Sequence, residues 1–168
     1  MKLSIPDPAL VLLIGPAGAG KSTFARAHFE PFEIVSSDHM RQLVSNDPAD
    51  QAASAEAFKL VSLLINGRLK RRLMTVVDAT SLRAANRRKY VQLATRYGVP
   101  VIAIAFQLDP RTYHARNRDR SGRIVEDGVV DRQIDLMDRA LAALPSEGYA
   151  AVHVLRESDD VTLEPRAG

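Results

Sequence analysis

The sequence predicts an α/β fold with a parallel β-sheet. Short apolar runs alternate along the chain with longer segments whose apolar residues recur at helical spacing, and this alternation is typical of repeated strand–helix–strand units. Residues 9–14 are continuously apolar, as expected for a strand that is buried on both faces of a sheet. The chain has 168 residues, 46% of them hydrophobic, which suits one domain with its own core.

The same patterns give the order of the elements. The five expected strands are residues 9–14, 33–36, 74–78, 99–106 and 150–155, and the expected helices are residues 21–29, 39–44, 48–73, 82–97, 111–120 and 129–144. Asp47 before Pro48 predicts the start of the third helix, Ser81 the start of the fourth and Gly98 its end. Residues 1–155 are expected to form the domain and residues 156–168 a polar, acidic tail or linker.

Composition excludes several classes of protein. The chain has no cysteine, which excludes a disulfide framework, a thiolate nucleophile and a zinc knuckle. Its longest apolar runs are far too short to span a bilayer, and its first residues lack a secretory signal. We therefore expect a cytoplasmic protein with no membrane partner. The net charge of +3 is compatible with a polyanionic partner and too small to argue for one.

A glycine-rich loop, Gly-Pro-Ala-Gly-Ala-Gly-Lys-Ser, follows the first expected strand. It fills every specified position of the G-x-x-x-x-G-K-S phosphate-binding pattern and precedes an expected helix. Its backbone N–H groups would surround the phosphates of ATP, Lys21 would reach the β- and γ-phosphates, and the Ser22 hydroxyl would bind Mg²⁺. These features predict a P-loop NTPase fold. The candidate ATP-binding residues here are Gly15, Gly18, Ala19, Gly20, Lys21, Ser22 and Thr23.

Two carboxylates lie at the carboxyl ends of other expected strands, at the sheet edge where ligands bind in open α/β folds. Asp38 is the candidate base that accepts a proton from an alcohol, and Arg41 would lie on the same helical face and hold an anionic part of that molecule. The alternative for Asp38 is that it only caps the following helix, and the alternative for Arg41 is that it is a solvated side chain. Asp78 is a candidate for the acceptor side or for the metal, with capping of the following amides as its alternative.

Residues 111–123 form the most basic stretch and predict an arginine-bearing lid. Arg116 and Arg120 are one helical turn apart, and Arg123 follows Gly122, a possible hinge. Closing over ATP, these arginines would neutralise the transferring phosphoryl group and exclude water. The alternative is a solvated helix paired with acidic residues, which fits Arg118 best. The basic residues of the helix at 82–97 are also expected to be solvated.

Taken together, these motifs resemble the 5′-hydroxyl polynucleotide kinase module of bacterial polynucleotide kinase-phosphatases. The resemblance runs over residues 9–155 and rests on the phosphate loop, on Ser-Ser-Asp-His-Met-Arg at 36–41, on Val-Val-Asp-Ala-Thr at 76–80 and on the arginines of 116–120. It implies an adenylate-kinase-like P-loop fold that transfers the γ-phosphate of ATP to the 5′-OH end of RNA or DNA in RNA repair.

The resemblance also implies roles for single residues. Lys21 and Ser22 would bind phosphates and Mg²⁺, Asp38 would be the general base, Arg41 would hold the first internucleotide phosphate of the acceptor, and Arg116 would act at the transferring phosphate. Enzymes of that family continue into phosphatase and ligase-like domains, so we expect an isolated kinase domain or a stand-alone relative. Ser81 stands where the family pattern has asparagine, on the acceptor side.

Two other functions fit the same residues. A small-molecule kinase acting on a sugar, nucleoside or antibiotic hydroxyl would keep Asp38 as the base, while Arg41 would bind a different anionic group. A nucleotide-sensing module would bind ATP and signal through closure of the lid. A sensor does not need an alcohol-activating base, and Asp38 therefore favours the kinases.

Overall fold

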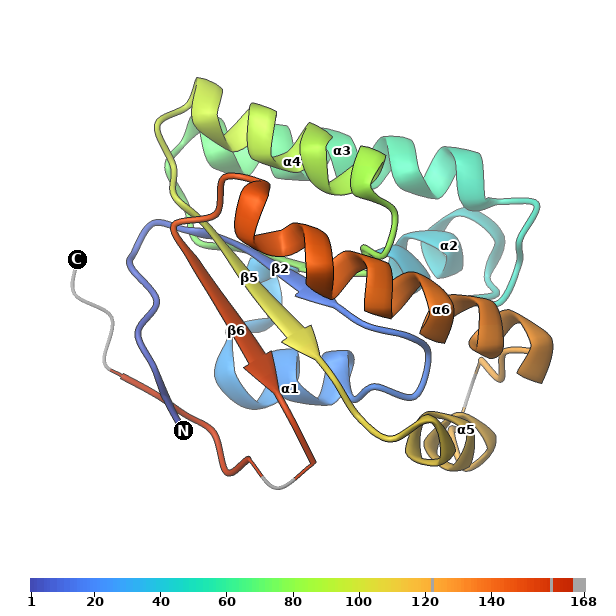
Figure 1. Ribbon diagram of the computed structural model, residues 1–168. Helices are drawn as coiled ribbons and strands as arrows, with labels where there is room; N and C mark the ends of the chain where they lie inside the picture. Colours follow the sequence, from blue (N-terminus) through green and yellow to red (C-terminus); the bar gives the residue numbers. More distant parts are fainter. Residues whose placement is uncertain (122, 158, 165–168) are drawn as a thin grey trace.

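The computed structural model describes residues 1–121, 123–157 and 159–164. Five parallel strands form its central sheet, in the order β3–β4–β2–β5–β6. They are β2 (Leu10–Ile14), β3 (Ile34–Ser36), β4 (Thr75–Asp78), β5 (Val101–Phe106) and β6 (Ala151–Leu155). Figure 1 labels three of them, β2, β5 and β6. Each expected strand is present and begins one or two residues later than expected. The predicted α/β fold with a five-stranded parallel sheet is confirmed.

Helices cover both faces of this sheet. Figure 1 shows α3, α4 and α6 on one face and α1 on the other. The helices are α1 (Lys21–His28), α2 (Ser37–Ser45), α3 (Ser54–Lys70), α4 (Ala84–Arg96), α5 (Pro110–Arg118) and α6 (Asp127–Ala143), with short 3-10 turns η1 (Pro31–Glu33) and η2 (Leu144–Ser146). Within the described ranges, no helix combines the length and apolarity needed to cross a membrane.

The apolar sequence of β2 is explained by its position in the centre of the sheet. Alternate side chains of a strand point to opposite faces, and Leu10 and Leu12 belong to the core beneath α3, α4 and α6. Val11 and Leu13 belong to the second core, on the side of α1. All five residues of β2 are fully buried, so this strand has no polar face.

Helices α2 and α6 begin two residues earlier than expected, and α3 and α4 do not begin at the residues predicted to start them. α3 begins at Ser54 instead of residue 48, because the Asp47 carboxylate accepts a hydrogen bond from the Ala49 amide and holds this segment in a turn. α4 begins after Arg83, and Ser81 is a buried residue with φ +50° and not the helix cap. Gly98 does follow the end of α4, with φ +63°.

A short parallel pair lies outside the main sheet. It joins β1 (Lys2–Leu3) to β7 (Thr162–Leu163), so part of the segment expected as a tail returns to the N-terminus. Leu3 is fully buried in the core on the α1 side. Ser158 and residues 165–168 of the expected tail lie outside the described residues, as does Gly122, the expected lid hinge.

The strand order positions the site. β2 lies between β4 and β5. From β2 the chain runs to β3 and then β4 on one side, and it afterwards crosses β2 to form β5 and β6 on the other side. Such a reversal leaves a crevice at the carboxyl ends of the strands. The P-loop begins there, directly after β2, and the Gly15 amide donates a hydrogen bond of 3.0 Å to the carbonyl of Thr80 beyond β4.

Candidate active site

The P-loop has the backbone conformation that its glycines predict. Gly20 is the N-cap of α1 with φ +89°, in the left-handed region that glycine adopts without strain. The helix therefore begins at Lys21, and its first N–H groups are directed towards the loop. Ala19 is buried, whereas Ser22 is half-buried and Thr23 is exposed beside the loop. This arrangement suits the binding of an anion at the helix N-terminus.

Gly18 packs directly against α5. It has φ +79°, and a Cβ atom at this position would lie 2.2 Å from the carbonyl oxygen of Tyr113. Tyr113 is itself fixed, because its hydroxyl donates to the Phe106 carbonyl (2.6 Å) and accepts from the Leu108 amide (2.8 Å). The glycine thus sets the distance between the P-loop and the helix that carries the lid arginines.

Lys21 is buried at the centre of the site. Its ammonium donates a 2.7 Å hydrogen bond to the Pro16 carbonyl, and the side chain is 9% exposed. Burial lowers the pKa of Lys21 to about 8, the nearby charge of Asp78 opposes this shift, and that of Arg120 adds to it. An anionic phosphate would favour the charged ammonium, so binding of ATP and protonation of Lys21 are coupled.

Asp38 is the point on which three arginines converge. Its Oδ1 accepts from Arg41 Nη1 at 2.8 Å and from Arg123 Nη1 at 2.7 Å, and its Oδ2 accepts from Arg120 Nη2 at 3.2 Å. The helix cap is Ser36, whose hydroxyl accepts from the His39 amide at 3.3 Å. The cap alternative for Asp38 is therefore wrong.

Arg41 is held from three sides. Besides its ion pair with Asp38, its Nε donates to the Ser54 hydroxyl at 3.0 Å, and its guanidinium lies 5.6 Å from the ring centroid of Phe58. The residue is only 5% exposed, so the solvated alternative is wrong. Burial, together with the charge of Arg123, lowers the pKa of Arg41 from its usual value. This buried cation can bind an anionic group near Asp38.

The lid runs between α5 and α6 and is tied at its base. Asn117 is fully buried; its Nδ2 donates to the Val125 carbonyl at 2.7 Å, and its Oδ1 accepts from the Val125 amide at 3.1 Å. This pair of bonds closes the segment that carries Arg120 and Arg123. Sequence reasoning missed Asn117, and nothing in its neighbourhood in the sequence distinguishes it from a surface residue.

The other lid arginines differ in position. Arg116 lies next to Gly20, with its Nη1 3.7 Å from where a Cβ of that glycine would be. Arg118 faces away, as expected, and pairs with Asp127 at 3.9 Å on the exposed side of the helix. Arg116, Arg120 and Arg123 are thus on the side of the P-loop and Asp38, whereas Arg118 is solvated.

Two cavities meet at the P-loop. The first, of about 480 Å³, is lined by Gly18, Gly20, Lys21, Ser22, Thr23, Arg26, Arg116, Asp119, Arg120 and Ser121. The second, of about 240 Å³, is lined among others by Lys21, Ser22, Asp38, Arg41, Asp78, Arg120 and Arg123. Lys21, Ser22 and Arg120 line both. The cavity at the phosphate loop and the cavity at the Asp38 carboxylate are therefore adjacent. Two cations, Lys21 and Arg120, and the Ser22 hydroxyl form the boundary between them.

Mg²⁺ fits the oxygen ligands at this boundary. Ser22 lines both cavities, and Asp78 is 7% exposed at the end of β4 and lines the second. In the part of the chain that the structure describes, Asp78 accepts no hydrogen bond from the amides of Thr80 and Ser81, and no cluster of three acidic, histidine or cysteine side chains could hold a metal by itself. Mg²⁺ commonly takes one or two protein ligands and completes its shell with phosphates and water.

A family model described as an AAA domain matches residues 10–144. The chain belongs to this family. The match covers the sheet from β2 to β5 and helices α1 to α6, and the AAA domain here has the P-loop kinase type of fold. That fold implies binding of ATP. No curated protein matches the sequence.

Solved structures with this fold act in different settings. A chain of the Pnkp1/Rnl/Hen1 RNA repair complex is 21% identical with a TM-score of 0.70, over 82% of this chain and 46% of that one. A putative kinase from Chloroflexus aurantiacus is 16% identical (TM-score 0.63, 92% of each chain). A gluconokinase from Sinorhizobium meliloti 1021 is 17% identical (TM-score 0.56, 93% of this chain and 86% of that one). The chain thus spans about half the length of the RNA repair protein.

Proposed function

We propose that this AAA domain is a polynucleotide 5′-hydroxyl kinase that transfers the γ-phosphate of ATP to the 5′-OH end of RNA or DNA. The observation that carries the proposal is the shared boundary of the two cavities, with the P-loop on one side and Asp38 and Arg41 on the other. A phosphoryl group at Lys21 and Arg120 would lie between its donor and a hydroxyl at Asp38.

The donor side has room for a whole nucleotide. A third cavity, of about 520 Å³, shares Gly20, Thr23 and Arg116 with the first and continues past the apolar side chains of Phe106 and Leu155. A nucleobase needs apolar surroundings of this kind beside a polar phosphate site. We therefore place the triphosphate on the P-loop and the base towards β5 and β6.

The reaction follows from the residues at the boundary. Asp38 Oδ1 accepts two of the arginine hydrogen bonds and Oδ2 only one, so Oδ2 retains a lone pair for the hydroxyl of the acceptor. The hydroxyl proton passes to Asp38, the oxygen forms a bond to the γ-phosphorus, and the bond from that phosphorus to the bridging oxygen breaks, releasing ADP. Lys21, Arg116 and Arg120 would stabilise the charge on the phosphoryl oxygens.

Arg41 supports a polynucleotide acceptor. It is a buried cation one helical turn from Asp38, so it would bind an anionic group a short distance from the reacting hydroxyl. The phosphate that follows the first nucleotide of a 5′-OH strand has this position. An RNA repair setting, with phosphatase and ligase-like domains in the same protein, is part of the proposal, in keeping with the fold shared with a chain of the Pnkp1/Rnl/Hen1 complex.

The second candidate is a small-molecule kinase, which the near full-length match to a gluconokinase favours. Incubation with γ-labelled ATP, Mg²⁺ and separate acceptors decides between the two: a 5′-OH RNA, a 5′-OH DNA, a nucleoside 3′-monophosphate, a nucleoside and gluconate. The proposal predicts label on the oligonucleotides and on the nucleotide, with a higher KM for the nucleoside, which lacks a phosphate for Arg41. Label on gluconate or the nucleoside alone would reject it, and ATP binding without transfer would favour a sensor.

A further inference from the structure

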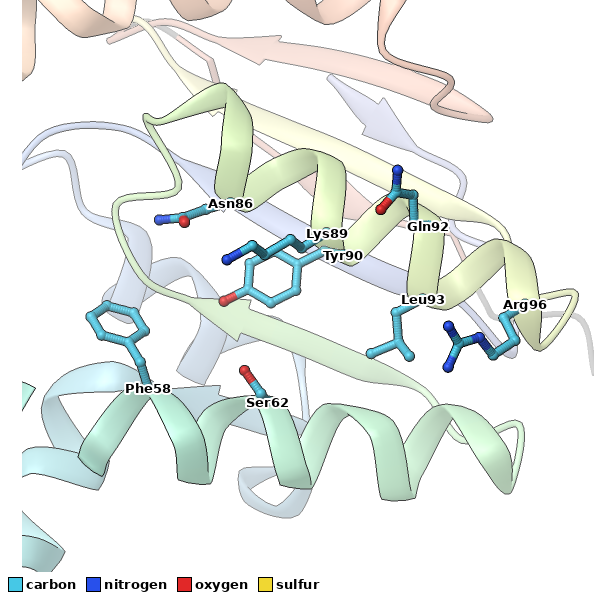
Figure 2. Close-up of a pocket in the computed structure, with 8 residues that line it drawn as sticks. All are labelled: Phe58, Ser62, Asn86, Lys89, Tyr90, Gln92, Leu93 and Arg96. Carbon is cyan, nitrogen blue, oxygen red and sulfur yellow. The ribbon is translucent and has the colours of Figure 1, made fainter. Parts of the chain in front are cut away.

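A groove separates α3 from α4, beside the acceptor cavity. It has a volume of about 520 Å³ and is lined by Phe58, Ser62, Asn86, Lys89, Tyr90, Gln92, Leu93 and Arg96. In Figure 2, Phe58 and Ser62 reach from α3 towards the ring of Tyr90 on α4, while Leu93 and Arg96 lie at the far end. None of these residues has a part in the reaction described above.

The groove is continuous with the acceptor cavity through one side chain. Phe58 lines both, and the Arg41 guanidinium lies over its ring. Arg41 also bonds Ser54, the first residue of α3. The N-terminal ends of α3 and α4 therefore lie at the sheet edge that carries Asp38 and Asp78, and the groove leads away from that edge along the two helices (Figure 1).

The charge of the groove is suited to a polyanion. α4 contains four basic residues and no acidic one. Arg87 is buried and bonded to both carboxylate oxygens of Glu147, and Arg88 does not line the groove. Lys89 and Arg96 are the cations that line it, and no acidic residue does. These two cations are seven positions apart in the helix, which is about 10 Å along its axis.

Its other side chains are of the kinds that bind bases. Phe58 is 37% exposed, and a ring with a guanidinium on one side can stack a base on the other. The ring of Tyr90 also lines the groove, and the Asn86 amide, on the same side of α4, can bond to base edges (Figure 2). Aromatic rings interleaved with cations are typical of sites for single-stranded nucleic acid.

We propose that the α3–α4 groove binds the nucleotides that follow the 5′-terminal one, as a track for the single strand leaving the active site. This inference rests on the proposed function and extends it. Arg41 would hold the first internucleotide phosphate, Phe58 would stack on a base at the entrance, and Lys89 and Arg96 would pair with phosphates further along.

The test compares a double variant in α4 with a matched double variant at and near the start of that helix. Lys89→Ala/Arg96→Ala removes the cations of the groove, and the matched control Arg83→Ala/Arg88→Ala removes two exposed cations that do not line it. We measure KM for a 5′-OH decanucleotide and for a nucleoside 3′-monophosphate, and the affinity of a labelled decanucleotide at several salt concentrations. The decanucleotide KM should rise about fivefold to tenfold in the groove variant only, and the slope of log affinity against log salt should fall by about 1.4.

The outcomes separate this inference from the function on which it rests. The mononucleotide KM, which does not involve the groove, should stay unchanged in both variants, and its phosphorylation tests the function alone. Equal effects of the two variants on decanucleotide affinity would overturn the inference, whether or not the mononucleotide is phosphorylated. A wild type that binds no decanucleotide would also overturn it. A third result would also overturn the inference: the wild type is a dimer, and the groove variant dissociates it without changing oligonucleotide affinity. The groove would then bind a second copy of the chain.

Discussion

Gly18→Ala tests whether the P-loop and the lid helix are held at a fixed distance. The new Cβ would lie 2.2 Å from the Tyr113 carbonyl oxygen, 1.2 Å less than the 3.4 Å at which ordinary contacts begin, so the loop and α5 must separate by roughly 1 Å. The left-handed backbone costs about 1–2 kcal/mol for alanine, and overpacking costs about 1–3 kcal/mol. We therefore expect the free energy of unfolding to fall by about 3 kcal/mol.

Urea unfolding measures this loss, and two other glycines serve as controls. Gly20→Ala meets the same backbone strain at φ +89° with its nearest neighbour at 3.7 Å, so it should lose only about 1–2 kcal/mol. Gly67→Ala, inside α3, where the nearest atom to the new Cβ is the flexible end of Arg71 at 3.8 Å, should gain about 0.5–1 kcal/mol. Displacing Arg116 by roughly 1 Å should also lower kcat about a hundredfold in Gly18→Ala. A loss no greater than that of Gly20→Ala would refute the close contact with α5.

Two further predictions concern Lys21 and the base of the lid. Because ATP binds the charged ammonium and burial lowers the pKa of Lys21 to about 8, the affinity for ATP should be constant below that pH and roughly tenfold weaker at pH 9 than at pH 7. Titration with a fluorescent nucleotide at several pH values should show this loss of affinity for the wild type and a pH-independent affinity for Lys21→Arg. A pH-independent affinity of the wild type would contradict the lowered pKa of Lys21. Asn117→Ala leaves the Val125 amide and carbonyl without their partner and should lower the free energy of unfolding by about 2 kcal/mol; an unchanged urea midpoint would show that the pair does not hold the lid.

Much of the fold could be predicted because the signals were local. A continuous apolar run such as β2 is needed wherever both faces of a strand are covered, and the P-loop pattern specifies its own backbone shape. Asp38 and Asp78 could be found because each lies at the carboxyl end of a strand, and these ends meet at one edge of a parallel sheet. The sequence thus predicts which side chains gather near the phosphate loop.

Other features depend on contacts that no local sequence pattern marks. Val125 and Asn117 pair across the lid, and Phe58 joins the acceptor cavity to a groove that two separate helices form. The pairing of Leu3 with Leu163 likewise joins the two ends of the described chain. The start of α3 was misplaced because Asp47 caps a turn as readily as a helix, and the sequence does not say which.

The role of Asp38 in phosphoryl transfer is the central claim, and single-turnover transfer tests it most directly. Wild type and Asp38→Asn, each saturated with γ-labelled ATP and Mg²⁺, are mixed with a 5′-OH oligonucleotide, and ATP affinity is measured in parallel. Asparagine keeps the shape of the side chain and cannot take the hydroxyl proton, so the transfer rate should fall about 10²- to 10⁴-fold while ATP binds with little change. A transfer rate within tenfold of the wild type would contradict the account.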